Sequence, residues 1–395
     1  MKVELAKALP FALFVVILPF PGTVGLRLLL LLLCFGTAVW QWWRIPSVRA
    51  AIPGMASIGV WVAVCAGSLF YSVDPAYSAG ELKNELGYTM MALFAFYVVA
   101  RDVALVVLVF RAAAIGLLFI GGWALLAWLH NGLFWDESGR YGGTGVFSTY
   151  LVTLVPMLTW MALADPRQRI RSIACGLVVF CLALALISLQ RVVWPAFAVQ
   201  GLILLFLLRD RLFPAIGNRR YWVAALLVVA IAAGALYGSQ QLRFGGHSAD
   251  AEHTTLSADV RFDFWPTVVA KVLEHPITGA GFGRQAMRKA YPEMVPENFT
   301  QLWHAHNTVL NYGLSAGLPG MAAILALFFG LGRVFWQRAR ENASLAAVTG
   351  LMLIAGVFVR NQFNDFFVRD MSLMFWAYVG IFIRLATHEP DQGGG

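Results

Sequence analysis

The stretch Trp303–Gly320 reads WHAHNTVLNYGLSAGLPG and lies where a long polar region meets an apolar run. His304 and His306 are two positions apart, and Asn307 follows directly. Asparagine is a favoured N-cap residue, which predicts that a helix begins just after His306. Residues two positions apart do not share a helix face, so we expect the two imidazoles to point in different directions. The stretch is therefore predicted to join a loop to a membrane helix, with His306 at the helix mouth.

The composition is that of a membrane protein. Of the 395 residues, 59% are hydrophobic and 13% are charged, whereas a soluble domain carries about 25% charged residues. The 14 tryptophans and 29 phenylalanines suit lipid-facing and interfacial positions. A net charge of +8 would suggest nucleic acid as a partner of a soluble protein. Here most basic residues lie in short loops, which indicates orientation in a membrane, with lipids and not nucleic acid as partners.

Apolar runs long enough to cross a bilayer recur along the whole chain. The sequence predicts an all-α polytopic membrane protein with about 12 transmembrane helices. The predicted spans are 8–20, 23–43, 52–71, 84–100, 103–129, 143–163, 172–190, 193–208, 221–239, 306–332, 344–359 and 371–385. The first resembles a signal peptide but lacks a cleavage site, so it is interpreted as a helix that is retained.

The distribution of arginines predicts the orientation. Loops that would face the cytoplasm are short and basic, as the positive-inside rule requires. They carry Arg44, Arg49, Arg101, Arg167, Arg169, Arg171, Arg209, Arg211, Arg219, Arg220, Arg333, Arg338 and Arg340. Both termini are then cytoplasmic. The expected organisation is nine spans in 1–239, a long periplasmic loop at 240–305, three spans in 306–387 and a cytoplasmic tail at 388–395.

The loop 240–305 is too long to be a simple connection, and such loops are usually functional or disordered. Apolar residues at helical spacing predict a helix over Thr267–Glu274, with Pro266 starting or kinking it. The segment Ile277–Gly283 reads ITGAGFG and predicts a glycine turn, and Arg284–Tyr291 predicts a short basic helix. We expect amphipathic helices on the outer leaflet that roof a cavity. Arg284 and Arg288 are candidate substrate-binding residues.

Several charges outside this loop are also candidates. Arg191 lies in a tight turn at the outer interface, where an arginine either extends to lipid headgroups or binds a phosphate. Arg27 and Arg111 lie near the ends of apolar runs, and extension to the headgroups accounts for both. The acids of the outer segments are by default solvated charges, although one could be a catalytic acid or a sugar contact. They are Asp74, Glu81, Asp365 and Asp370.

The residue types leave three interpretations of the histidines open. A neutral imidazole is a natural general base, which favours a catalytic His306. An interfacial histidine with a structural hydrogen bond is the second interpretation. The third is a metal site made by His304 and His306 with His247 or His253, but the spacing of zinc motifs is missing. The four cysteines lie inside apolar runs and form no disulfide framework. No metal or cofactor is expected.

The sequence around these residues resembles a known family. His306-Asn307, nine residues, then Gly317-Leu318-Pro319-Gly320 matches the signature H-[NSQ]-x9-G-x-x-[GTY] of O-antigen ligases of the WaaL type and their polymerase and oligosaccharyltransferase relatives. The run Arg261–Trp265 (RFDFW), followed by Glu274–Gly281 (EHPITGAG), resembles the outer loop of the same family. Arg191 resembles the family's R-x3-L motif imperfectly, since residue 195 is proline.

The resemblance implies a metal-independent, inverting glycosyltransferase in the inner membrane of a Gram-negative bacterium, with its site on the periplasmic side. It implies an undecaprenyl-diphosphate-linked O-antigen as donor and lipid A–core as acceptor, in lipopolysaccharide biosynthesis. In these terms His306 is the general base, and Arg191 and Arg261 bind the diphosphate. His304, Asn307, Arg284 and Arg288 are further candidate substrate contacts. The role of His304, the glycan, the acceptor sugar and the oligomeric state stay open.

Other functions compete with this interpretation. An O-antigen polymerase uses the same donor with a different acceptor. A protein O-glycosyltransferase is less favoured, because such enzymes tend to carry a sizeable domain after the last span, and only His388–Gly395 follow the last predicted span here. A transporter of the lipid-linked glycan predicts charged or broken helices at mid-membrane and an internal repeat, and the sequence has no such repeat.

Overall fold

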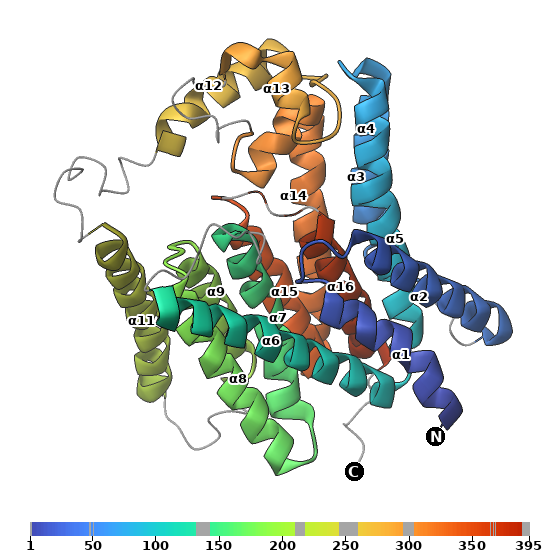
Figure 1. Cartoon of the computed structure of the whole chain (residues 1–395), viewed down its shortest axis with the longest axis vertical. Coiled ribbons are helices and arrows are strands. Elements are labelled where there is room, and N and C mark those ends of the chain that lie inside the picture. The colour runs from blue at the N-terminus through green and yellow to red at the C-terminus, as the bar shows by residue number, and fades with distance from the viewer. Residues whose placement is uncertain are drawn as a thin grey trace.

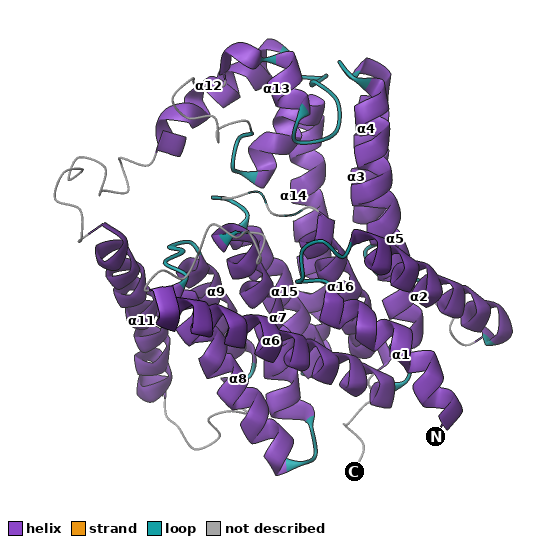
Figure 2. Cartoon of the chain, in the orientation of Figure 1, coloured by secondary structure: helices purple, strands orange, loops and turns teal. Residues whose placement is uncertain are grey.

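The computed structural model describes residues 2–46, 49, 51–131, 143–209, 218–244, 260–294, 304–363, 365, 367 and 369–388. Every regular element in these residues is a helix, and none is a strand (Figures 1 and 2). The predicted all-α fold is therefore confirmed.

Each predicted span coincides with a helix. In chain order these are α1 (Lys2–Ile17), α2 (Val24–Arg44), α3 (Met55–Gly67), α5 (Tyr88–Val99), α6 (Val103–Asn131), α7 (Thr144–Ala164), α8 (Gln168–Ile187), α9 (Val193–Leu207), α11 (Asn218–Phe244), α14 (Thr308–Asn342), α15 (Leu345–Arg360) and α16 (Arg369–His388). The remaining described elements are η2 (Ser68–Tyr71), α4 (Pro75–Leu82), the π-helical turn η3 (Lys83–Gly87), α12 (Val260–Glu274), α13 (Ala286–Ala290) and η6 (Pro292–Met294).

By length and composition, seven helices of the described residues can cross a membrane. They are α2, α6, α7, α8, α11, α14 and α16. Shorter apolar helices occupy four more of the predicted spans, at α1, α3 with η2, α9 and α15. The chain is thus a polytopic membrane protein, and the larger number of twelve spans stays a prediction.

The helix α16 lies in the middle of the bundle and packs against α5, α7 and α15 (Figure 1). Trp376 of α16 stacks on Trp61 of α3, with ring centroids 5.6 Å apart. Gly380 allows α5 to approach closely, because a Cβ there would lie 2.5 Å from the carbonyl oxygen of Leu93. Small residues serve this purpose between membrane helices, where close packing drives association.

The helix α14 is broken near its start. Ala316 and Gly317 leave the helical conformation, and Gly317 takes a φ of 63°, which favours glycine. The Leu318 N–H donates to the carbonyl of Pro276 at 2.8 Å and not to its own helix. Pro319 has no N–H to donate. The carbonyls four residues earlier therefore need other donors.

The predicted glycine turn supplies these donors. The Ala280 N–H donates to the Leu314 carbonyl at 2.8 Å, and the Gly281 N–H donates to the Ser315 carbonyl at 3.1 Å. Buried backbone groups are costly when unpaired, so the turn and the broken helix stabilise each other. The glycine turn supplies the N–H donors, and the broken helix supplies the carbonyl acceptors.

The same turn also contacts the segment that precedes α4. The Val73 N–H donates to the Ala280 carbonyl at 3.0 Å. Gly281 has a φ of 100°, and a Cβ at this position would overlap the side chain of Ser72. The turn is therefore wedged between two segments that are more than 200 residues apart in the chain, and only glycine fits there.

The helices α12 and α13 lie beyond one end of the bundle, above α14 in Figure 1. The α12 helix begins earlier than the predicted Thr267, at Val260, and contains Pro266 within its first turns. Its buried face joins α13 and α14 in a small apolar cluster. The cluster contains Phe264, Val268, Val272, Met287, Met294, Ala305 and Leu314. This cluster holds α12 against the start of α14.

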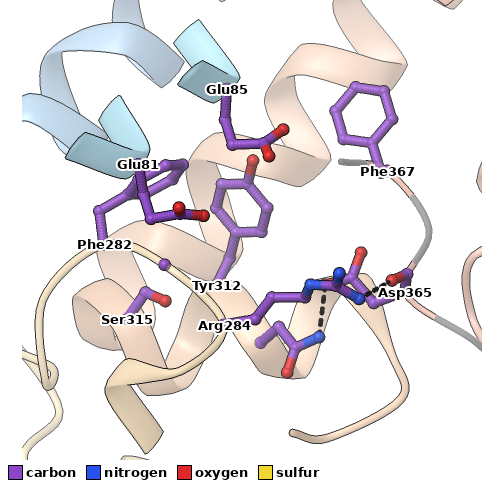
Figure 3. Close-up of a pocket in the computed structure, with 10 residues that line it drawn as sticks. Glu81, Glu85, Phe282, Arg284, Tyr312, Ser315, Asp365 and Phe367 are labelled. Carbon is purple, nitrogen blue, oxygen red and sulfur yellow. Dashed lines mark hydrogen bonds between the residues drawn. The ribbon is translucent and has the colours of Figure 1, made fainter. Parts of the chain in front are cut away.

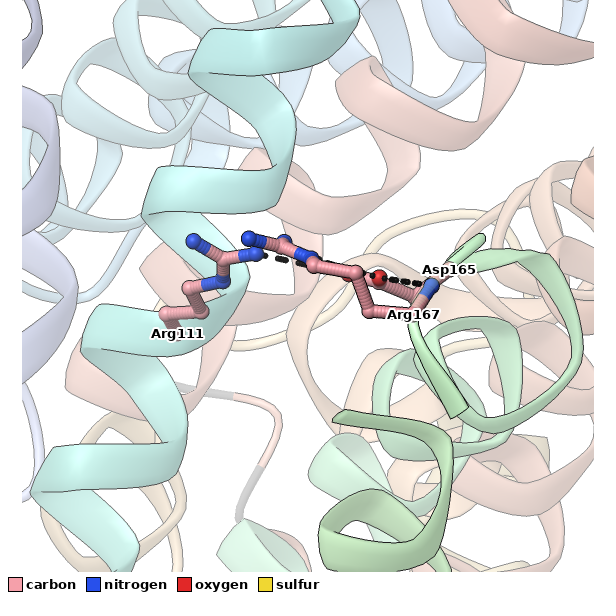
Figure 4. A network of polar contacts seen from close by, with 3 residues as sticks. All are labelled: Arg111, Asp165 and Arg167. Carbon is pink, nitrogen blue, oxygen red and sulfur yellow. Dashed lines mark hydrogen bonds and ion pairs between the residues drawn. The ribbon is translucent and has the colours of Figure 1, made fainter. Parts of the chain in front are cut away.

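Two arginines near helix ends have carboxylate partners, so the expectation that they extend to headgroups is wrong for Arg27 and incomplete for Arg111. Arg27 is 5% exposed and pairs with Asp370. Arg111 of α6 reaches the buried Asp165 at 3.4 Å, and Arg167 reaches it at 3.1 Å (Figure 4). A charge that is removed from water needs such a partner.

The wedged turn makes a stability prediction. Gly281→Ala places a Cβ against Ser72 in a backbone conformation that L-residues disfavour. We expect the free energy of unfolding to fall by at least about 1–3 kcal/mol from backbone strain alone. Thermal unfolding in detergent measures this change. Gly122→Ala is the matched control, because its Cβ meets nothing within 4 Å. Equal stability of the two variants would contradict the role of the turn.

Candidate functional site

The start of α14 has the predicted cap. The Oδ1 of Asn307 accepts a hydrogen bond from the Leu310 N–H at 3.0 Å, and Asn307 has extended backbone angles. Its Nδ2 donates to the carbonyl of Gln362 at 2.9 Å. The predicted helix start is confirmed. The cap residue also holds the segment between α15 and α16, which is predicted to be the last outer segment, against the site.

The two histidines stack on each other. Their ring centroids are 3.9 Å apart and the rings are inclined by 32°. His306 has a φ of 50°, and its N–H donates to the Nδ1 of His304 at 3.1 Å. The expectation that the imidazoles point in different directions is therefore wrong, because it assumed regular backbone. A neutral His304 then carries its proton on Nε2, since Nδ1 is the acceptor.

The peptide between the histidines is held on both sides. The Ala305 N–H donates to the Oδ1 of Asn311 at 2.8 Å, and the Ala305 carbonyl accepts from the Nε1 of Trp265 at 2.8 Å. Ala305 is fully buried. Because both polar groups are paired, the backbone at Ala305 is held in one orientation, which determines the positions of the two neighbouring histidine side chains. Trp265 of α12 therefore contributes to the site by holding this backbone.

Cationic groups surround His304. The side chain is 4% exposed, and burial lowers its pKa well below the ordinary value. His306, Arg284 and Arg261 add to this shift through their charges. The structure thus brings together four of the predicted site residues. A region of this charge attracts anions such as phosphate groups.

Both loop arginines reach the last outer segment. An Nη1 of Arg261 donates to the carbonyl of Phe363. An Nη1 of Arg284 donates to the carbonyl of Asp365 at 2.7 Å (Figure 3). Each guanidinium presents its N–H donors in a planar fork, and the bond to the carbonyl orients that fork.

The buried acid of the site is Asp365, which the sequence interpretation treated by default as a solvated charge. It is 3% exposed. Its carboxylate accepts from the Oγ1 of Thr308 at 2.9 Å and from the Nδ2 of Asn311. The default interpretation was wrong because both donors lie more than 50 residues earlier in the chain. Asn311 therefore joins Asp365 to the peptide between the histidines.

Comparison with known proteins identifies this region. Residues 176–325 match the family model described as O-antigen ligase. This segment, which is less than half of the chain, is similar to the O-antigen ligase family. None of the curated proteins compared with the chain matches it. The family consists of membrane-bound bacterial enzymes of the glycosyltransferase type, so the resemblance seen in the sequence is confirmed at this level.

The matched segment of the O-antigen ligase family includes the histidine pair, α12 and the glycine turn. It ends before the last outer segment, which contributes Asp365. The site is thus completed by residues outside the matched segment. No sequence motif marks Asp365, and a charged residue in an aromatic segment (NQFNDFFVRD, residues 361–370) was the only signal for it.

Two other predicted residues occupy different positions. Arg191 is half-buried in the turn between α8 and α9, where its carbonyl accepts from the Trp194 N–H at 3.3 Å. Arg288 is exposed on α13, whose neighbouring Met287 is buried against α12. The roles of both residues stay predictions.

The metal alternative has no support among the described residues, where no three His, Cys, Asp or Glu side chains converge on a point. His247 and His253, the further candidate ligands, lie outside the residues that the structure describes. The metal-free character of the site therefore stays a prediction of the O-antigen ligase resemblance.

The lowered pKa of His304 makes stability depend on pH. Its pKa in the folded protein is well below the ordinary value of 6.5, so the unfolded chain binds this proton more readily. Stability is then fully present above about pH 6.5 and is lost as pH falls below it. Thermal unfolding between pH 7.5 and 5 measures this loss of stability. The loss should be smaller in the His304→Gln variant. An unchanged pH dependence in this variant would contradict a buried neutral His304.

Proposed function

We propose that the protein is an O-antigen ligase that transfers a glycan from undecaprenyl diphosphate to lipid A–core. The observation that carries the proposal is the half-buried imidazole of His306 at the start of an apolar helix, stacked on His304, whose electrostatic environment includes Arg261 and Arg284. A base and cations at the end of a span suit a reaction between two lipid-anchored substrates at a membrane surface.

In the proposed reaction an acceptor hydroxyl attacks the anomeric carbon of the donor. The new C–O bond forms as the bond from that carbon to the diphosphate oxygen breaks, and the electron pair leaves with the diphosphate. His306 takes the proton of the hydroxyl. Attack opposite to the leaving group inverts the anomeric configuration. No covalent glycosyl-enzyme is required.

The arginines would stabilise the leaving diphosphate. Arg261 and Arg284 are oriented by backbone carbonyls of the last outer segment. Preorganised donors of this kind need little rearrangement when negative charge develops on the leaving group. We place Arg191 in the same role on the basis of its motif, and His304 beside His306 as the acceptor of the His306 N–H.

The proposed location is the inner membrane of a Gram-negative bacterium, with the site on the periplasmic side and both termini in the cytoplasm. The short basic loops support this orientation. The seven apolar helices long enough to cross a membrane, in the part of the chain that is described, support membrane insertion.

An O-antigen polymerase is the second candidate, because the family match does not distinguish acceptors. Reconstitution of the purified protein with a lipid-linked donor and both acceptors tests the choice. We expect product on lipid A–core. Product only on a second donor molecule would make the protein a polymerase, and the transfer should survive exhaustive chelation of metals.

The proposed role of His306 as general base can be tested by substitution. His306→Ala should lower transfer by at least about 100-fold, since general-base catalysis contributes a factor of this size or more. The measurement is glycan transfer by protein reconstituted in liposomes. His275→Ala is the matched control, because His275 is exposed at the end of α12. Retained transfer in His306→Ala would remove this residue from the mechanism.

The guanidinium of Arg261 makes a separate prediction. Arg261→Ala and Arg261→Lys should both lower kcat, because lysine replaces a planar fork with a point charge. We expect losses of about tenfold or more for lysine and larger losses for alanine, measured in the same transfer assay. Arg340→Lys is the matched comparison, because Arg340 is exposed near the far end of α14. Full activity of Arg261→Lys would mean that charge alone suffices.

A further inference from the structure

A small polar pocket lies beside the histidine cluster, between the start of α5 and the glycine turn. It has a volume of about 30 Å³, which gives room for one or two water-sized groups. Its polar lining includes Glu81, Glu85, Arg284, Asn311, Tyr312 and Asp365. Figure 3 shows the Glu81 and Glu85 carboxylates on one side, and Arg284 with Asp365 on the other.

Glu85 has an oxygen that lacks a hydrogen-bond partner. The residue is 6% exposed, and its Oε2 accepts from the Arg369 N–H at 2.7 Å. Its Oε1 is buried without a partner and belongs to the pocket lining. A buried carboxylate oxygen is expensive to leave unpaired, so such a group in a pocket indicates a missing hydrogen-bond donor.

The backbone at Glu85 gives an independent indication. Residues Lys83–Gly87 form a π-helical turn between α4 and α5. Such turns are rare because their geometry is unfavourable, and they occur frequently at functional sites. Here the turn brings Glu85 into the interior, next to the start of α16.

The polar lining of the pocket indicates the kind of ligand. Three acidic side chains and one arginine line it, in contrast to the cationic surroundings of His304. A carboxyl oxygen accepts hydrogen bonds from O–H donors. The aromatic rings of Phe282 and Phe367 also line the pocket and provide apolar surface for C–H groups. A hydroxyl or hydroxymethyl group fits these properties.

The pocket is connected to the reactive histidines through two residues. Asn311 lines the pocket and also accepts from the Ala305 N–H at 2.8 Å. Arg284 lines the pocket and contributes to the electrostatic environment of His304. A sugar held at the pocket therefore lies next to the peptide that positions His306.

We propose that this pocket is a subsite for a hydroxyl group of a substrate sugar, with Glu85 as the hydrogen-bond acceptor. The inference rests on the proposed function, because it presumes that a saccharide reaches this face. The sugar can come from the acceptor or from the donor glycan. In either case the subsite sets which sugar is accepted, while the arginines bind the diphosphate.

Direct binding tests the subsite without requiring transfer. Two soluble probes are used with the full chain in detergent: core oligosaccharide freed from lipid A, and donor glycan freed from its diphosphate carrier. Saturation-transfer NMR titrations give the Kd of each probe. We expect Glu85→Gln to raise the Kd of one probe by about tenfold, the loss expected for a hydrogen bond to a charged group. The probe affected identifies the source of the sugar.

Glu341→Gln is the matched control, since the side chain of Glu341 is 60% exposed at the far end of α14. Thermal unfolding checks that Glu85→Gln is folded, and Glu81→Gln in the same pocket replaces it if it is not. Failure of the wild-type protein to bind either probe, or equal binding by the pocket variant, would overturn the subsite. Transfer by the wild type is assayed in parallel, so binding without transfer would count against the proposed ligase function alone.

Discussion

Two backbone hydrogen bonds join the broken start of α14 to the glycine turn, from Ala280 to the Leu314 carbonyl and from Gly281 to the Ser315 carbonyl. Pro319 removes one helical donor and the break at Gly317 redirects another, so these carbonyls would otherwise be buried and unpaired. The first turns of α14 are thereby separated from the long span that follows. Thr308 and Asn311, two residues of the candidate site, lie on this separate short helix.

The position of this short helix determines which side chains meet at the candidate site. The short helix presents Thr308 and Asn311 to Asp365, and Asn311 holds the peptide between the histidines. The glycine turn continues into Arg284, which reaches the last outer segment. Three parts of the chain that are distant in sequence thus meet at one place. The diphosphate-binding and sugar-binding functions that we propose use different sides of it, one cationic and one acidic.

Much of the fold follows from local sequence. Apolar runs located the helices, and Asn307 located the start of α14, because spans and caps depend on residues close together in the chain. The histidine signature also indicated the candidate site, which stays a prediction. Contacts between distant segments were not predictable in this way. The stacking of the imidazoles depends on a peptide held by Trp265 and Asn311, and the burial of Asp365 depends on donors from another helix.

In the mechanism that we propose, the cationic side of the histidine cluster binds a diphosphate while His306 faces the reacting carbon. A cryo-electron microscopy structure of the protein with undecaprenyl diphosphate bound would show this arrangement. We expect phosphate oxygens within about 3 Å of the Arg261 guanidinium, with the terminal phosphate on the side of His306. A diphosphate bound at the other end of the bundle, with the histidine cluster unoccupied, would contradict it.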